Sequence, residues 1–200
     1  MNIGVIGVNK QSLGLIDFLK QNNHVSIYET KKKLTRNGID VVDGVTWSDP
    51  EHMVKNVDII FICELTDEND YTDLENSILG VGNWAFVHEQ RTIVVIVSVI
   101  ELGGFEKHIE KHIERFSGSN VSLIFAPAPN LNPFSYAELL YYATDNLSKI
   151  IFNELINKYK KLPSWCSIKM LEMVSFLNTE LTEAERQNFC QLANTAYQLT

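Results

Sequence analysis

The chain has 200 residues, of which 45% are hydrophobic and 21% charged, and its net charge is −8 at pH 7. This composition is typical of a globular protein with one sizeable core, so one main domain is expected. The negative charge and the lack of a dense Lys/Arg stripe exclude the electrostatic footprint of a protein that binds nucleic acid or an anionic membrane. The basic run at residues 31–33 is expected to be a solvated loop or helix end.

No apolar stretch approaches the roughly 18 residues needed to cross a bilayer, and the chain begins directly with an expected strand. These features predict a soluble, cytoplasmic protein. The three cysteines, Cys63, Cys166 and Cys190, are widely spaced and form no C-x-x-C motif. Neither a disulfide framework nor a structural zinc site is therefore expected, and the thiols are interpreted as buried or incidental.

The first expected strand, residues 2–7, leads into an altered dinucleotide-binding turn, G-V-N-K-Q-S, at residues 7–12. In the Rossmann pattern G-x-G-x-x-G, the first glycine makes the turn, the second admits a pyrophosphate, and the third lets the helix pack closely. Gly7 keeps the first role, with Val8 after it, while Asn9 and Ser12 occupy the other two positions. Dinucleotide binding stays open, because asparagine tolerates left-handed backbone geometry and could itself donate a hydrogen bond to a pyrophosphate.

Four further strands are expected at residues 24–29, 57–63, 92–98 and 121–125, where β-branched residues are frequent. Helices are expected at 11–21, 105–116 and 148–161, so the pattern predicts a Rossmann-like, doubly wound α/β fold with a mostly parallel sheet. Glu29 ends the second strand about twenty residues after Gly7, the spacing at which a carboxylate accepts the ribose hydroxyls of NAD. The alternative is that Glu29 only ends a strand in solvent.

Residues 167–199 can form one long helix, because apolar residues recur at helical intervals without Gly or Pro. The expected organisation is a Rossmann-like domain at 1–165 followed by a C-terminal helix at 166–200. A helix that stands outside the core needs a surface to pack against, and a partner subunit would provide one.

Several segments along the chain carry a family resemblance. After the strand at 57–63 the chain reads E-L-T-D; residues 97–103 read V-S-V-I-E-L-G, residues 125–129 read F-A-P-A-P, and residues 171–178 read L-E-M-V-S-F-L-N. In this order they resemble the UDP-glucose/GDP-mannose dehydrogenase family, whose corresponding motifs are V-P-T-P, S-T-V-P-x-G-T, P-E-F and A-E-L-x-K. The resemblance implies NAD as the cofactor, with Thr66 and Ser98 near it, and a dimer built largely on the long helix.

The same resemblance implies that catalysis has been lost. Val99 stands where the family has a threonine, Ala128 where it has a glutamate, and Ser175 where it has a lysine. These replacements remove groups that would transfer protons or stabilise an oxyanion, so no catalytic residue is assigned. The family also uses a cysteine after its central helix, and this chain ends within the matching helix.

The predicted function is therefore that of a truncated, inactive relative that acts as a nucleotide-binding or protein-interaction module. Through its C-terminal helix it would form a homodimer or dock on a full-length homologue. The alternative is an NAD-dependent oxidoreductase acting on a small alcohol or a nucleotide sugar.

Two other groups of residues have competing interpretations. His108 and His112 have the i, i+4 spacing of a metal pair, but the charged residues around them favour a solvated helix face, and no metal is predicted. Phe134, Tyr136, Tyr141 and Tyr142 could stack on a base, although core packing or an interface is favoured.

Overall fold

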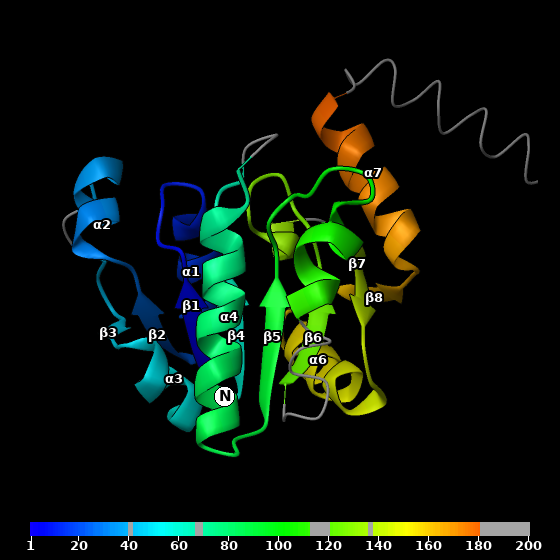
Figure 1. Ribbon diagram of the computed structural model, residues 1–200. Coiled ribbons are helices and arrows are strands. Elements are labelled where there is room, and N and C mark those ends of the chain that lie inside the picture. Colours follow the sequence, from blue (N-terminus) through cyan, green and yellow to red (C-terminus); the bar gives the residue numbers. More distant parts are fainter. Residues whose placement is uncertain (40–41, 67–69, 113–120, 136–137, 181–200) are drawn as a thin grey trace, which may run out of the picture.

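A computed structural model describes residues 1–39, 42–66, 70–112, 121–135 and 138–180. They form an eight-stranded sheet with helices on both faces (Figure 1). The strands are β1 Asn2–Ile6, β2 His24–Tyr28, β3 Thr46–Trp47, β4 Ile59–Ile62, β5 Thr92–Ile96, β6 Val121–Phe125, β7 Glu138–Ala143 and β8 Leu162–Trp165. Their order is β3-β2-β1-β4-β5-β6-β7-β8, and only the β6–β7 pairing is antiparallel. The first six strands thus have the Rossmann order, which confirms the predicted fold class.

The helices connect these strands and cover the sheet. They are α1 Ser12–Leu19, α2 Lys31–Asn37, α3 Pro50–Asn56, α4 Thr72–Val87, α6 Asn146–Lys158 and α7 Ile168–Glu180, with a π-helix, η1, at Phe105–Glu110 and a 3₁₀ turn, η2, at Pro133–Ser135. The helices expected near 11–21 and 148–161 are confirmed, and the expected C-terminal helix is confirmed as far as Glu180. Residues 181–199 of the expected C-terminal helix and residues 113–116 of the helix expected at 105–116 lie outside the described residues.

Two hydrophobic clusters, one on each face of the sheet, hold the layers together. Leu15 and Ile16 of α1 pack with Phe152 of α6 in one cluster, while Leu74 of α4 and Leu171 of α7 belong to the other. The central strand β4 is buried along its whole length. A strand covered on both faces reads as a continuous apolar run, which is why the sequence pattern located it.

Three strands were not predicted, for different reasons. β3 has only two residues, too few for a pattern. β8 contains Pro163, which reads as a break in the pattern but is tolerated because β8 is an edge strand. β7 lies in the aromatic stretch: Phe134 and Tyr141 are buried in the core, as favoured, while Tyr136 lies outside the described residues.

Cys63 is a free thiol. Cys63 is fully buried, and burial together with the nearby Glu64 carboxylate raises the pKa of its thiol well above the usual value. Cys166 is half-buried, and Cys190 lies outside the described residues. Within the described part of the chain, no helix is long and apolar enough to cross a membrane.

Candidate functional site

A cavity of about 340 Å³ lies where β1, β2 and β4 end. In open α/β sheets, ligands bind outside the carboxyl ends of the strands, near the point where the strand order reverses. Polar and charged side chains dominate the lining, which consists of Asn9, Glu29, Lys33, Asn37, Glu64, Leu65, Asp70 and Asp73. Asn9 and Glu29 were predicted site residues, and the structure brings them together here.

Gly7 makes the turn that the sequence assigned to it. Its φ angle is +92°, and a Cβ atom at this position would lie 2.8 Å from the backbone carbon of Cys63. Both the backbone conformation and the contact with the end of β4 therefore require glycine.

Asn9 has a different role from the one expected. Its carboxamide Oδ1 accepts hydrogen bonds from the backbone N–H groups of Gln11 and Ser12, each at 3.0 Å. Its Nδ2 donates to the carbonyl oxygens of Gly7 at 3.2 Å and Cys63 at 2.8 Å. The residue is only 4% exposed and is not among the described residues with a positive φ. The side chain is therefore turned into the protein and bonded to the start of α1.

Ser12 is hydrogen-bonded to Asn9 within the same turn. Its hydroxyl accepts a hydrogen bond from the backbone N–H of Asn9 at 2.8 Å and donates to the Asn9 carbonyl at 3.0 Å. Ser12 is fully buried. The backbone N–H groups of residues 9, 11 and 12, at the place where a Rossmann turn faces a pyrophosphate, are all bonded to side chains of the loop itself.

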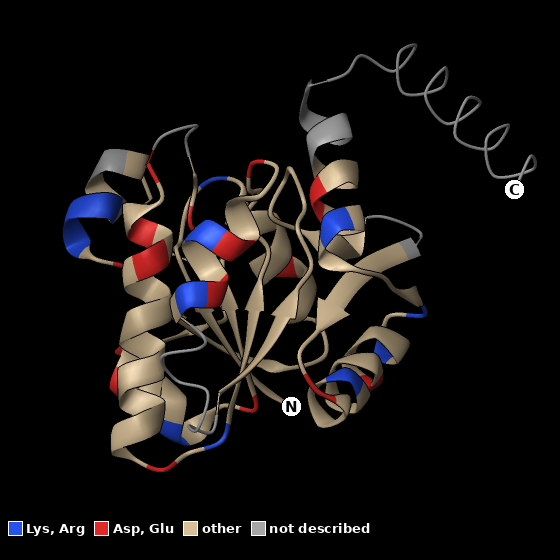
Figure 2. Cartoon of the chain, turned by 45° about the vertical axis from the view of Figure 1, so that its right-hand side comes forward, with Lys and Arg blue, Asp and Glu red and all other residues tan. Residues whose placement is uncertain are grey.

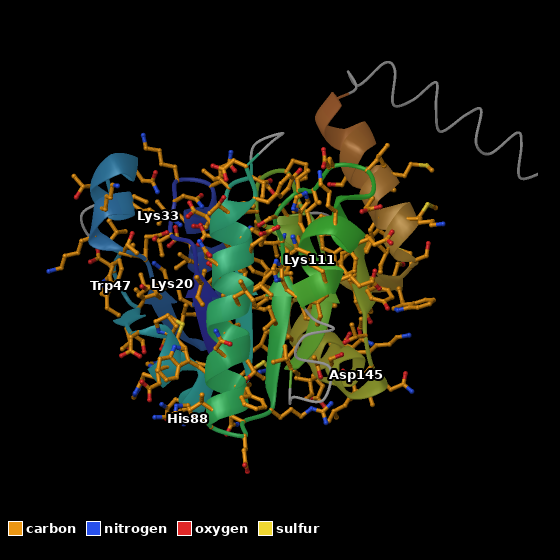
Figure 3. All side chains as sticks on the ribbon, in the orientation of Figure 1. Lys20, Lys33, Trp47, His88, Lys111 and Asp145 are labelled. Atoms are coloured by element: carbon orange, nitrogen blue, oxygen red, sulfur yellow. The ribbon has the colours of Figure 1, made fainter. Side chains whose placement is uncertain are left out.

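Lys33 lies at the centre of a group of carboxylates. Its Nζ is 2.9 Å from Glu64, 3.1 Å from Asp73 and 3.9 Å from Glu29. Figure 3 marks Lys33 between α2 and the upper part of α4. Residues 31–33 form the first turn of α2, which agrees with the expected helix end, and Lys31 and Lys32 are exposed. Lys33 differs from the expectation, because its side chain is 26% exposed and ties α2 to the ends of β2 and β4 and to α4. Blue and red segments lie close together on the helices above the strand ends in Figure 2.

Two of the four acidic side chains that line this cavity, those of Glu64 and Glu29, are buried. The Glu64 side chain is 7% exposed, and it also accepts a hydrogen bond from the Ser77 hydroxyl at 2.8 Å. The Glu29 side chain is 4% exposed, and its Oε1 accepts from the Thr30 N–H at 2.7 Å. Glu29 is therefore not a solvent-facing strand end, and it remains a candidate ligand for ribose hydroxyls.

Burial and neighbouring charges shift the ionisation of this group. Burial raises the pKa of Glu29; the Thr30 hydrogen bond opposes that shift, and the charge of Glu64 adds to it. Burial alone would lower the pKa of Lys33, but hydrogen bonds to Glu64 and Asp73 and the charges of Glu64 and Glu29 raise it. Lys33 is consequently a firmly protonated ammonium at neutral pH.

The remaining predicted cofactor residues act as braces in this structure. The Thr66 hydroxyl donates to the Val99 carbonyl at 2.6 Å, and the Ser98 hydroxyl donates to the Glu64 carbonyl at 2.7 Å, so together they join the loops after β4 and β5. Val8 is fully buried, and its carbonyl accepts from the Asn37 side chain at 3.2 Å. None of these three residues lines the cavity.

Sequence reasoning missed Lys33 and Glu64. Lys33 stands four residues after Glu29, and this i, i+4 relation across the start of a helix could have indicated an ion pair. Glu64 directly follows the buried run of β4, and the carboxyl ends of neighbouring parallel strands meet at one edge of the sheet.

His108 and His112 do not lie on a solvated face, so that expectation is wrong. Both side chains are 12% exposed and face Glu75 of α4: His108 Nδ1 lies 2.9 Å from Oε1, and His112 Nε2 lies 3.5 Å from Oε2. Lys111, labelled in Figure 3, is also 2.9 Å from Glu75 Oε1. Burial alone would raise the pKa of Glu75, but hydrogen bonds from His108 and Lys111 and the nearby positive charges lower it to about 2.

This histidine cluster is a structural ion-pair group that attaches η1 to α4. His108 also stacks on Tyr71, with the ring centroids 4.0 Å apart. Among the described residues, no group of three or more His, Cys, Asp or Glu side chains is arranged to hold a metal ion.

Several solved structures have a similar fold. A UDP-glucose dehydrogenase from Pyrobaculum islandicum superposes with a TM-score of 0.73 at 15% identity, over 88% of this chain and 48% of that one. A GDP-mannose dehydrogenase from Pseudomonas aeruginosa gives 0.73 at 16%, over 98% and 51%, and a UDP-D-ManNAc dehydrogenase from Pyrococcus horikoshii gives 0.69 at 17%, over 89% and 50%. The fold is UDP-sugar dehydrogenase-like.

The UDP-sugar dehydrogenase-like fold accounts for most of this chain, which spans about half the length of these solved structures. No protein-family model and no curated protein matches the sequence. At 15–17% identity the likeness establishes the fold and leaves the chemistry to the site residues.

Proposed function

We propose that this UDP-sugar dehydrogenase-like chain is catalytically inactive and acts as a protein-interaction module. The observation that carries this proposal is Ala128, which replaces the family's glutamate, is fully buried, and donates its backbone N–H to the Val97 carbonyl at 3.0 Å. A buried methyl group can neither accept nor donate a proton. At the matched threonine position, the half-buried Val99 offers only methyl groups and a carbonyl already bonded to Thr66.

Turnover measurements test this proposal directly. The purified chain is incubated with NAD and, in turn, UDP-glucose, UDP-D-ManNAc and GDP-mannose, and NADH formation is followed by absorbance. A GDP-mannose dehydrogenase serves as the positive control. We expect no NADH above the rate without protein, and sustained turnover with any of these sugars would refute the proposal.

One observation favours the alternative of an NAD-dependent oxidoreductase. Glu29 lies at the end of β2 and lines the cavity, as a ribose-binding carboxylate would. If this function holds, Glu29→Gln should weaken NADH binding, while replacement of the exposed Glu154 by Gln on α6 should leave it unchanged. Equal binding by both variants would remove the support for this alternative.

For the interaction, we propose α7 as the contact surface and a second copy of the chain as the partner. On its inner side Leu171 is 2% exposed and the Glu172 carboxylate accepts from the Phe105 N–H at 2.8 Å, so the helix is anchored. On its outer side Met170 and Met173 are 52% and 43% exposed. Light scattering should give a dimer that Met170→Glu with Met173→Glu converts to monomer, and a monomeric native chain would refute this assignment.

A further inference from the structure

The turn after β1 bears on whether this fold can hold a dinucleotide at all. In a Rossmann domain the pyrophosphate lies at the N-terminus of the first helix and accepts hydrogen bonds from backbone N–H groups of the glycine-rich turn. We propose that the side chains of Asn9 and Ser12 take the place of that phosphate, so that the chain does not bind NAD, and that these two residues are sufficient to close the site.

Three backbone donors of this turn, the N–H groups of residues 9, 11 and 12, are already used. Asn9 Oδ1 accepts from the N–H groups of Gln11 and Ser12 at 3.0 Å, and Ser12 Oγ accepts from the N–H of Asn9 at 2.8 Å. The carboxamide and hydroxyl oxygens thus present to the helix start the acceptors that phosphate oxygens would otherwise supply. A bound phosphate would have to displace both of them.

Displacement of Asn9 has a further consequence. Its Nδ2 satisfies the carbonyl oxygens of Gly7 and Cys63, and Cys63 is fully buried at the end of β4. Rotating the carboxamide outward would leave these two acceptors without that donor, and unpaired buried polar groups are unfavourable. The hydrogen bond to Cys63 also joins the turn after β1 to the end of β4, at the carboxyl-terminal end of the sheet.

The electrostatics of the adjoining cavity act in the same direction. Four carboxylates, those of Glu29, Glu64, Asp70 and Asp73, line it together with the single ammonium of Lys33. That ammonium is already bonded to Glu64 at 2.9 Å and to Asp73 at 3.1 Å. An excess of negative charge in the cavity weakens the binding of a pyrophosphate, and this contribution is the same in the native chain and in variants of the turn.

This inference is independent of the lost catalytic positions, because it concerns only the turn at residues 7–12. Replacing Asn9 and Ser12 with glycine would restore the complete pattern G-V-G-K-Q-G there. Gly7 already has the required conformation, with φ +92°. The double variant therefore frees the three backbone donors without changing the remainder of the cavity.

The experiment is a titration of the full chain with NADH, followed by nucleotide fluorescence and by the melting temperature. We expect no response from the native chain at millimolar NADH, and a saturable response from Asn9→Gly/Ser12→Gly. The gain in affinity should be about tenfold or more, the factor that corresponds to one hydrogen bond to a charged group. Asn22→Gly, at an exposed position, is the matched control and should not respond.

Two further variants keep the test decisive. If the double glycine variant is unfolded by circular dichroism, Asn9→Ala, which frees the N–H groups of Gln11 and Ser12, is titrated in its place. Asn9→Asp keeps an acceptor at the helix start and should remain closed to NADH. The proposal is refuted if the native chain binds NADH as well as the opened variant does, or if the folded opened variants bind no better than the native chain. Turnover of a nucleotide sugar would refute only the inactive state.

Discussion

The attachment of α7 to the Rossmann core should depend on one buried carboxylate. Glu172 is 5% exposed and accepts hydrogen bonds from the backbone N–H groups of Phe105 at 2.8 Å and Gly103 at 3.2 Å. Glu172→Ala leaves both donors without that acceptor. A hydrogen bond to a charged group contributes roughly 1.5 kcal/mol or more, so we expect a loss of about 3 kcal/mol from the free energy of unfolding.

Urea unfolding and differential scanning calorimetry measure this loss. For a chain of this length, about 3 kcal/mol corresponds to a fall in melting temperature of roughly 6–12 °C. Glu154→Ala, at an exposed position on α6, is the control and should stay within about 0.5 kcal/mol of the native chain. Equal stability of the two variants would show that Glu172 does not anchor α7, and the hydrogen bonds at the start of η1 would then have no energetic importance.

Three other perturbations have defined outcomes. The pKa of Glu75 is lowered to about 2, so its ion pairs stabilise the fold above pH 4.5 and are lost as the pH falls towards 2. Glu75→Gln should therefore lower the free energy of unfolding at neutral pH by about 1–2 kcal/mol after solvent screening, and this difference should disappear in acid. Urea unfolding at several pH values measures it. Gly7→Ala should cost about 3 kcal/mol or more, seen as a lower unfolding midpoint, because a Cβ there would lie 2.8 Å from the Cys63 backbone. Phe152→Ala, in a fully buried aromatic cluster, should cost about 3–5 kcal/mol; a smaller loss by calorimetry would contradict the packing described.

The sheet could be predicted wherever a strand is buried on both faces. The runs at β4 and β5 are continuous and apolar, so the pattern located them to within a few residues. The far edge of the sheet could not be predicted in the same way, because β8 contains a proline and β7 runs antiparallel to its neighbour β6. Edge strands tolerate residues that would exclude them from the centre of a sheet.

The candidate site was only partly predictable. The spacing from Gly7 to Glu29 brings both residues to one edge of the sheet, and this depends on the chain path alone. The direction of the Asn9 side chain depends on the Cys63 carbonyl, which is 54 residues away in the sequence. A local pattern contains no such partner, so asparagine in a glycine position read as a tolerated substitution, whereas it is a bonded component of the turn.

The closed turn also explains how this fold can remain stable without a cofactor. A protein that binds a ligand only in its native state gains stability from it, about 2.7 kcal/mol at a hundred times the dissociation constant. Here Asn9 makes four hydrogen bonds within the protein, and at roughly 0.5–1.5 kcal/mol each they contribute about 2–6 kcal/mol. The Asn9 side chain is always present, so the N–H groups at the start of α1 have hydrogen-bond acceptors at any nucleotide concentration. In the proposed unliganded state, the hydrogen bonds at the start of α1 therefore do not depend on NAD.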